Sequence, residues 1–204
     1  AKFGKPIILS TGMNNIKSIG PCVDIFRKYN TSYALLHCTS LYPTPYDKVR
    51  LGALTQMKNQ FKDAVLGLSD HSLGNYTCFG AVSLGASILE KHFTSDKQWP
   101  GPDVLISIDP RELKELIHGS AAIHSALGGN KEILREEQPT IDFAYASVVT
   151  IAEIKKGEVF SEENIWVKRP GTGEILARKY KDIIGRRSAN DLTSDHQLRR
   201  DDVI

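Results

Sequence analysis

Hydroxyl, imidazole and carboxylate side chains follow four short apolar segments of this 204-residue sequence, at the point where each segment ends. In chain order these polar ends are Ser10-Thr11-Gly12, His37-Cys38-Thr39-Ser40, Ser69-Asp70-His71 and Glu90-Lys91-His92. Short hydroxyl donors and backbone N–H groups suit a phosphate, and imidazoles on neighbouring strands suit a divalent metal ion. The residue types therefore predict a site for a phosphorylated ligand and a metal ion.

Two of the histidines, His71 and His92, end consecutive apolar segments and are the candidate metal ligands. Two neutral imidazoles leave several coordination positions open, which is typical of a catalytic metal site. The alternative is that each imidazole only hydrogen-bonds a neighbouring group. His37 lies inside its apolar segment, so we expect it to pack among other side chains or to support the site from behind.

Two proline-containing loops follow the second and fourth apolar segments. The sequence "YPTPY" (residues 42–46) holds aromatic side chains on a stiffened loop, and "WPGPD" (residues 99–103) presents Asp103 in the same way. Asp103 is a candidate for binding sugar hydroxyls, although both loops are also compatible with rigid surface turns. Arg169, in "VKRPGTG", is by itself an ordinary solvated arginine.

The elements that must position these residues follow one repeated arrangement. Each apolar segment is short and continuous rather than alternating, which predicts parallel strands buried on both faces. The four expected strands lie within residues 6–13, 33–40, 64–71 and 86–93. Helical patterns fill the intervals at residues 14–29, 46–61, 76–85 and 109–129, although Pro21 is unfavourable inside the first. Asp109, Pro110 and Gly128 mark the start and end of the last helix.

Residues 1–128 are therefore interpreted as four consecutive βα units. Polar residues follow every strand rather than one switch point, which favours a barrel over a doubly wound sheet. A closed barrel needs about eight such units, so we expect an N-terminal half to lie outside this chain. Residues 129–145 are polar and predict a linker, and residues 146–204 predict a small β-rich module.

The bulk composition excludes some classes of partner. The formal net charge is +2, which gives no electrostatic support for binding nucleic acid. No apolar segment approaches the roughly 20 residues that span a bilayer, so we expect no membrane partner. The three cysteines form no CxxC pair, which favours free thiols in a reducing cytoplasm.

Taken together and in order, these motifs resemble the bacterial sialic acid synthase (N-acetylneuraminate synthase) family. The segments that carry the resemblance are "ILSTGM", "LLHCTSLYPTPY", "GLSDHSLGN", "ILEKHFT", "PGPD" and "IKKGEVFSEENIWVKRPGTG". The family fold is a TIM (β/α)8 barrel followed by an SAF, or antifreeze-like, domain. The resemblance implies that residues 1–128 are the C-terminal half of the barrel and that residues 146–204 are the SAF domain.

The resemblance also implies an activity, which is the metal-dependent condensation of phosphoenolpyruvate with N-acetylmannosamine and the release of phosphate. The metal, Mn2+ or Mg2+, would bind to His71 and His92, with Glu90 on the same side of its strand and Lys91 turned toward the helices. Ser10, Ser40 and Ser69 match positions that bind phosphoenolpyruvate, although relatives often carry Asn at the position of Ser40. Tyr42 and Asp103 match positions that bind the sugar.

The family further implies a homodimer in which each SAF domain covers the partner's barrel. In that arrangement Arg169 reaches the partner's sugar and Phe143 packs on its N-acetyl methyl group. We expect a cytoplasmic enzyme, and we expect this chain alone to be inactive, since the family's catalytic acid and basic phosphate ligands lie in the other half. The alternatives are a legionaminic or pseudaminic acid synthase, which uses a 2,4-diacetamido sugar, and a non-catalytic sugar-binding module.

Overall fold

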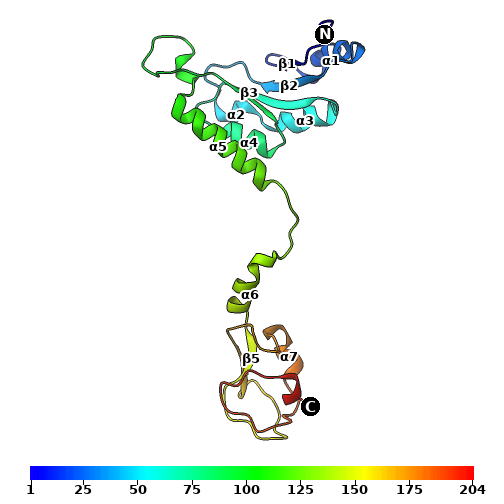
Figure 1. Cartoon of the computed structure of the whole chain (residues 1–204), viewed down its shortest axis with the longest axis vertical. Helices are drawn as coiled ribbons and strands as arrows, with labels where there is room; N and C mark the ends of the chain where they lie inside the picture. The colour runs from blue at the N-terminus through cyan, green and yellow to red at the C-terminus, as the bar shows by residue number, and fades with distance from the viewer. The chain divides into compact units, whose positions relative to one another are not determined.

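The computed structural model describes all 204 residues, which form two compact units, Ala1–Gly129 and Asn130–Ile204. Figure 1 shows the elements of each unit along the chain, with the parallel strands in the first and the smaller β structure in the second. No helix in either unit has the length and apolar character needed to cross a membrane.

The first unit is built on four parallel strands in the order β1-β2-β3-β4. Their bounds are β1 Ile7–Ser10, β2 Tyr33–Cys38, β3 Val65–Asp70 and β4 Ile88–Lys91. The register pairs Ser69 with Glu90 and Asp70 with Lys91 at the carboxyl ends of β3 and β4. All four strands lie within the expected segments. Every residue of β2 is buried, as the continuous apolar pattern predicts.

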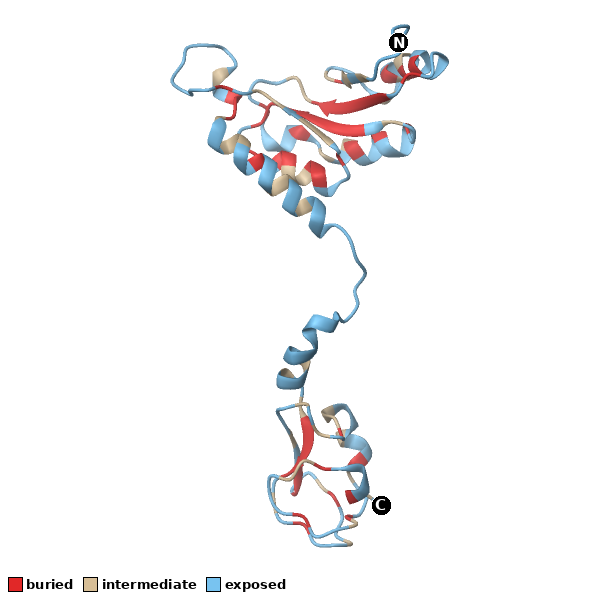
Figure 2. Ribbon diagram, in the orientation of Figure 1, coloured by how far each residue is buried: buried red, intermediate tan, exposed pale blue.

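Helices cover one face of this sheet, and Figure 2 shows in red the buried residues of the strands and helices. Their bounds are α1 Ile16–Lys28, α2 Tyr46–Val49, α3 Gly52–Gln60, α4 Tyr76–Ser83, the short 3-10 helix η1 Val104–Ile106 and α5 Pro110–Ala126. Alternate strand residues such as Leu35, Leu66 and Leu68 pack against these helices. The other face carries Ile8, which is 59% exposed. Strands in sequential order with helices on one face only make a half-barrel, not a doubly wound sheet.

The helical segment expected at residues 46–61 is wrong as a single helix, because it breaks into α2 and α3. Arg50 adopts a left-handed conformation between them, with φ 56° and ψ 54°. The last carbonyls of α2 are bonded outside the helix, since Thr39 donates to the Lys48 oxygen and His37 contacts the Val49 oxygen at 2.6 Å. Groups outside the helix therefore end it.

Helix α5 follows local rules more closely. In α5 the Asp109 carboxylate accepts hydrogen bonds from the N–H groups of Arg111 and Glu112, and the Glu112 side chain accepts from the Asp109 N–H. This is the expected N-terminal cap. Helix α1 continues through Pro21, which lies on its exposed face, where water can replace the lost hydrogen bond.

Gly67 marks a close approach between β3 and its neighbours. A methyl group at this position would lie 2.5 Å from the Ile88 carbonyl oxygen and 2.3 Å from a Leu36 methyl carbon. We expect Gly67→Ala to lower the free energy of unfolding by about 1–3 kcal/mol, because the Ile88 backbone must move to make room for the added methyl group. Urea unfolding followed by circular dichroism tests this. Gly52→Ala is the matched control, since nothing lies within 4 Å of its added methyl; equal losses at both positions would contradict the prediction.

The second unit has a small antiparallel sheet, β5 Ser147–Thr150 with β6 Ile165–Lys168. Its helical elements are the 3-10 helix η2 Arg135–Glu137, α6 Gln138–Ala144, η3 Ala177–Lys179, α7 Tyr180–Ile183 and η4 Arg200–Asp202. A core that includes Val148, Phe160 and Leu198, all fully buried, holds this unit together. Both η2 and α6 lie within residues 129–145, so part of the segment expected to be a linker is helical.

Asp202 makes the stability of the second unit depend on pH. Burial alone would raise the pKa of its carboxyl, but hydrogen bonds from the Arg199 N–H, the His196 ring and the Asn190 amide outweigh burial and hold the pKa below its ordinary value. A depressed folded-state pKa contributes stability above the unfolded pKa of about 3.9 that is lost as pH falls.

We expect Asp202→Asn to cost about 1–3 kcal/mol at pH 7, because hydrogen bonds to a charged group weaken. The variant should also lose less stability than the original protein between about pH 4 and pH 2. Urea unfolding followed by the fluorescence of Trp166, in a Trp99→Phe background, reports on this unit alone. Parallel pH profiles for the two proteins would contradict the prediction.

Candidate functional site

His71 directly follows β3 and is held in one orientation. It is only 6% exposed, and its Nδ1 lies 3.0 Å from the Thr39 carbonyl oxygen. Because a carbonyl oxygen only accepts hydrogen bonds, Nδ1 carries the proton and Nε2 keeps its lone pair. Metal-binding histidines are commonly oriented in this way by a carbonyl group.

Three further side chains converge on His71 at the carboxyl ends of the strands. The His92 ring lies 5.2 Å from it between centroids, in an edge-to-face arrangement. The Tyr42 ring stacks on His71 at 4.1 Å and meets His92 edge-on at 6.0 Å. An Asp103 carboxylate oxygen lies 3.8 Å from Nδ1 of His92. The structure therefore brings together four residues that the sequence placed on separate segments.

A cavity of about 400 Å³ opens beside this group, between the end of β4 and the loop of residues 99–103. His92, Trp99 and Asp103 are among the residues that line it. Asp103 is exposed, and its backbone carbonyl accepts a hydrogen bond from Ser107, which anchors the loop. The loop thus presents a carboxylate to a space large enough for a small polar ligand.

The residues present fit a divalent metal ion with open coordination positions. His71 offers Nε2, and His92 lies beside it with a partly exposed ring. No cluster of three or more potential ligands from His, Cys, Asp and Glu forms in the chain. These residues would therefore supply two imidazoles, and water or substrate would fill the remaining positions.

The hydroxyl and carboxylate groups expected to contact a phosphorylated ligand lie on the neighbouring strands. Ser69 donates a hydrogen bond to Glu90 at 2.8 Å, across the β3–β4 pair. Ser10 ends β1 and is exposed. Ser40 lies beside Gly12, where a methyl group would come within 2.3 Å of the Ser40 hydroxyl oxygen. All four groups belong to the same carboxyl edge of the sheet as His71.

Phe143 and Arg169 lie together in the second unit. The Arg169 guanidinium carbon is 6.0 Å from the centre of the Phe143 ring, and both side chains are exposed. A guanidinium over an aromatic face is a favourable arrangement. The pair thus offers a charged and an apolar surface side by side.

Asp70 was not predicted as a site residue, and it lies behind the site on the helical face. Its carboxylate accepts a hydrogen bond from Lys91 Nζ at 2.6 Å, and both side chains are almost completely buried. Burial alone would raise the pKa of Asp70, but the hydrogen bond and charge of Lys91 outweigh burial and lower it. The alternation along β4 correctly predicts that Lys91 faces the helices, and opposite charges on neighbouring strand ends were the available signal.

Burial also keeps two other groups of the first unit uncharged. It lowers the pKa of His37, which contacts the Val49 carbonyl oxygen and is packed as expected. It raises the pKa of the Cys78 thiol to about 12. Neither group is therefore a charged participant at the carboxyl edge.

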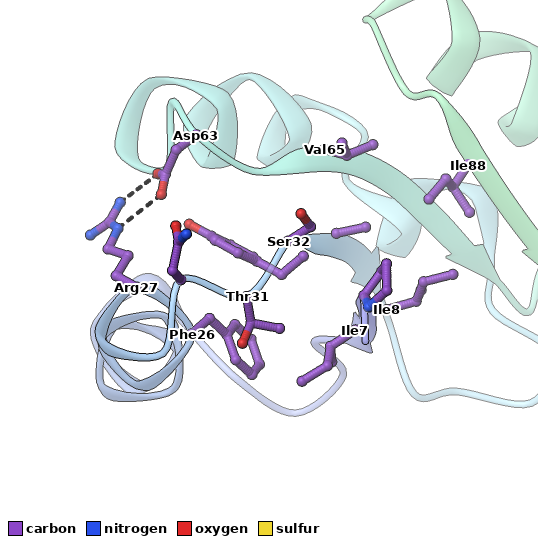
Figure 3. Close-up of a pocket in the computed structure, with 13 residues that line it drawn as sticks. Ile7, Ile8, Phe26, Arg27, Thr31, Ser32, Asp63, Val65 and Ile88 are labelled. Carbon is purple, nitrogen blue, oxygen red and sulfur yellow. Dashed lines mark hydrogen bonds and ion pairs between the residues drawn. The ribbon is translucent and has the colours of Figure 1, made fainter. Parts of the chain in front are cut away.

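Another cavity of the first unit, of about 590 Å³, lies at the opposite end of the strands (Figure 3). It is lined mainly by apolar residues such as Ile8, Val65 and Ile88, with the Arg27–Asp63 ion pair at one side. The amino ends of barrel strands are not where catalytic groups gather. The smaller cavity at His92 is therefore the better candidate site.

Comparison with known proteins assigns both units. Residues 1–132 match the NeuB family and residues 145–204 match the SAF domain. The chain is 41% identical to the N,N'-diacetyllegionaminic acid synthase of Campylobacter jejuni, over 98% of this chain and 60% of the relative. It is 35% identical to a pseudaminic acid synthase of Campylobacter jejuni, over 99% and 59%. The chain thus spans about 60% of the length of these curated relatives.

A solved structure is also similar to this chain. It is the N-acetylneuraminic acid (sialic acid) synthetase of Leptospira borgpetersenii in complex with citrate, which is 38% identical. The likeness has a TM-score of 0.60 and covers 66% of this chain and 47% of that structure. It agrees with the half-barrel described above.

Proposed function

Because this chain belongs to the NeuB family, we propose that it supplies the metal-binding and sugar-binding part of a synthase that condenses phosphoenolpyruvate with an amino sugar. The observation that carries the proposal is the convergence of Tyr42, His71, His92 and Asp103 at the carboxyl ends of parallel strands. This is the edge at which a (β/α)8 barrel places its catalytic groups.

A divalent cation, Mn2+ or Mg2+, bound to Nε2 of His71 and to His92 would supply a Lewis acid that polarises the aldehyde oxygen of the open-chain sugar. Tyr42 lies against both imidazole rings and Asp103 lies beside His92, so in this proposal they bind and orient hydroxyl groups of that sugar. Glu90 lies in β4, two residues before His92, and orients either His92 or the sugar. These residues together fix the acceptor carbon next to the phosphoenolpyruvate site.

Ser10, Ser40 and Ser69 bind phosphoenolpyruvate in this proposal. In the reaction the enol carbon forms a bond to the aldehyde carbon, water adds to the resulting cationic carbon, and phosphate leaves with cleavage of its C–O bond. The Ser69 hydroxyl already donates a hydrogen bond to the Glu90 carboxylate. Its hydroxyl must therefore rotate away from Glu90 before it can donate to a phosphate or carboxylate oxygen of the substrate.

The proposed sugar is a 2,4-diacetamido hexose, so the product is a legionaminic-type or pseudaminic-type acid. The named relatives at 41% and 35% identity support this choice. The motifs alone favoured N-acetylmannosamine, and the relatives support the alternative better. N-acetylmannosamine remains the second candidate, because the sialic acid synthetase structure is 38% identical over 66% of this chain.

The test uses the protein from the complete reading frame that contains this chain, with Mn2+ and phosphoenolpyruvate. The diacetamido hexose and N-acetylmannosamine are offered separately, and phosphate release and product mass are recorded. Preference for the diacetamido sugar supports the proposal, and preference for N-acetylmannosamine moves the protein to sialic acid synthesis. Turnover of neither sugar would contradict the synthase function and leave a sugar-binding module.

We also propose a homodimer in which Phe143 and Arg169 of one protomer contact the sugar bound by the other. Their exposure and mutual contact at 6.0 Å support a ligand-facing role. In this arrangement the second unit excludes water from the reacting groups. Sedimentation equilibrium tests the oligomeric state, and a monomer at working concentration would contradict this part of the proposal.

A further inference from the structure

A buried polar cluster lies directly behind the candidate site, on the helical face of β3 and β4. One carboxylate oxygen of Asp70 accepts hydrogen bonds from Lys91 Nζ at 2.6 Å, Thr77 Oγ1 at 2.8 Å and Ser72 Oγ at 2.9 Å. The other oxygen accepts from the Ser72 N–H at 3.1 Å. Lys91 Nζ also donates to the Ser72 carbonyl oxygen. Both charges are therefore paired and hydrogen-bonded.

The cluster occupies the last paired position of the two strands. Asp70 and Lys91 are the final partners in the β3–β4 register, and no ladder pair follows them. The next residue on each strand is a proposed metal ligand, His71 after Asp70 and His92 after Lys91. Because side chains alternate along a strand, the ion pair faces the helices while the imidazoles face the site.

The segments that follow β3 and β4 separate immediately beyond this position. The backbone carbonyl of His71 accepts from the Thr44 N–H, whereas that of His92 accepts from the Ile108 N–H. The two histidines are thus tied to different neighbouring segments. The ion pair is the last direct link between their strands, so it limits how far the two imidazoles can move apart.

General stability is a weak explanation for such a pair. Two charges are costly to remove from water, and well-packed apolar residues of similar volume commonly serve as well. A fully hydrogen-bonded pair instead imposes one geometry, because its partners lose their bonds when the strands shift. The site that gains from a fixed geometry is the pair of imidazoles, whose ring centres are 5.2 Å apart.

We propose that the Asp70–Lys91 ion pair is a positioning device that fixes the separation of the His71 and His92 imidazoles for binding one divalent cation. Its consequence for turnover rests on the proposed function, whereas its effect on cation binding does not require any substrate. Asp70 and Lys91 are positioning residues, since they act through the histidines that follow them.

The test combines Asp70→Asn with Lys91→Met, which removes both charges while approximately keeping side-chain volume. Mn2+ binding to the protein from the complete reading frame is measured by electron paramagnetic resonance without substrates. We expect affinity to fall by about 10–100-fold, the effect typical of groups that orient metal ligands. We also expect the double variant to unfold at a higher urea concentration than Lys91→Met alone, because no lone charge stays buried. A folded double variant with Mn2+ affinity within about twofold of the original would overturn the proposal.

Two further variants keep the test decisive. If the double variant does not fold, Thr77→Val removes a single hydrogen bond to Asp70 and should weaken Mn2+ binding by about 2–5-fold; unchanged affinity would again overturn the proposal. Leu116→Ala is the control for destabilisation alone, since Leu116 is buried in the same unit but makes no bond to the cluster. It should leave Mn2+ affinity unchanged, and a loss equal to that of Thr77→Val would mean that the effect is merely structural.

His71→Ala separates this inference from the proposed function. Loss of Mn2+ binding in His71→Ala together with full affinity in the folded double variant refutes the positioning role and leaves the metal site intact. Full affinity in His71→Ala refutes the metal site itself, and with it both proposals. Reduced affinity in both variants, with Leu116→Ala unaffected, is the expected result.

Discussion

Replacing Lys91 with Met should lower the free energy of unfolding of the first unit by about 3–5 kcal/mol. The substitution keeps the apolar stem but leaves the Asp70 carboxylate buried without its cation, since the two side chains are only 2% and 1% exposed. The remaining donors, Ser72 and Thr77, are neutral and cannot replace a charge. Urea unfolding followed by circular dichroism at 222 nm measures the loss, because the longest helices belong to this unit.

The size of this effect should depend on pH in a defined direction. In the original protein Lys91 lowers the pKa of Asp70, so the pair contributes stability above the unfolded pKa of about 3.9. In Lys91→Met burial acts without the cation and raises the pKa of Asp70. Protonation then removes the unpaired buried charge, and with it the destabilisation, as pH falls. The difference in stability between the two proteins should therefore be largest at neutral pH and shrink toward about pH 4.

Lys97→Met is the matched control for Lys91→Met. Lys97 forms an ion pair with Glu112 at 2.5 Å, but the two side chains are 44% and 30% exposed. A pair in contact with water contributes only about 0–1 kcal/mol. Similar losses for the two substitutions would show that burial does not govern the contribution of Lys91.

Local sequence patterns were sufficient to predict the half-barrel. The four apolar segments are continuous because the strands are covered on one face by helices and carry residues such as Leu36 on the other. Asp109 and Pro110 predicted the start of α5, because a helix N-terminus needs an acceptor for its free N–H groups. Such features depend on neighbouring residues alone.

Features set by distant residues were not predictable in the same way. The break at Arg50 depends on His37 in β2 and on Thr39 just after it, which contact the last carbonyl groups of α2. The stacking of Tyr42 on His71 joins residues from two strand ends, and no spacing within either segment reports it. Tertiary contacts therefore overrode local propensity at the site, where groups from several strands must meet.

His71→Ala should remove Mn2+-dependent phosphate release by at least about 100-fold, provided that the proposed function is correct. The substitution deletes Nε2, and the Lewis-acid contribution at stake is several kcal/mol, of which each 1.4 kcal/mol is about tenfold in rate. Tyr42 also loses the ring on which it stacks at 4.1 Å, so the sugar contact weakens together with the metal site. Phosphate release is measured over a series of Mn2+ concentrations with the protein from the complete reading frame.

His118→Ala is the control for this last prediction, because His118 is exposed on α5, within the same unit. Its turnover should equal that of the original protein. The two variants together distinguish loss of a metal ligand from a general effect of removing an imidazole. Turnover in His71→Ala that matches His118→Ala at every Mn2+ concentration would mean that Nε2 of His71 holds no cation. The orientation imposed by the Thr39 carbonyl would then serve packing against Tyr42 instead.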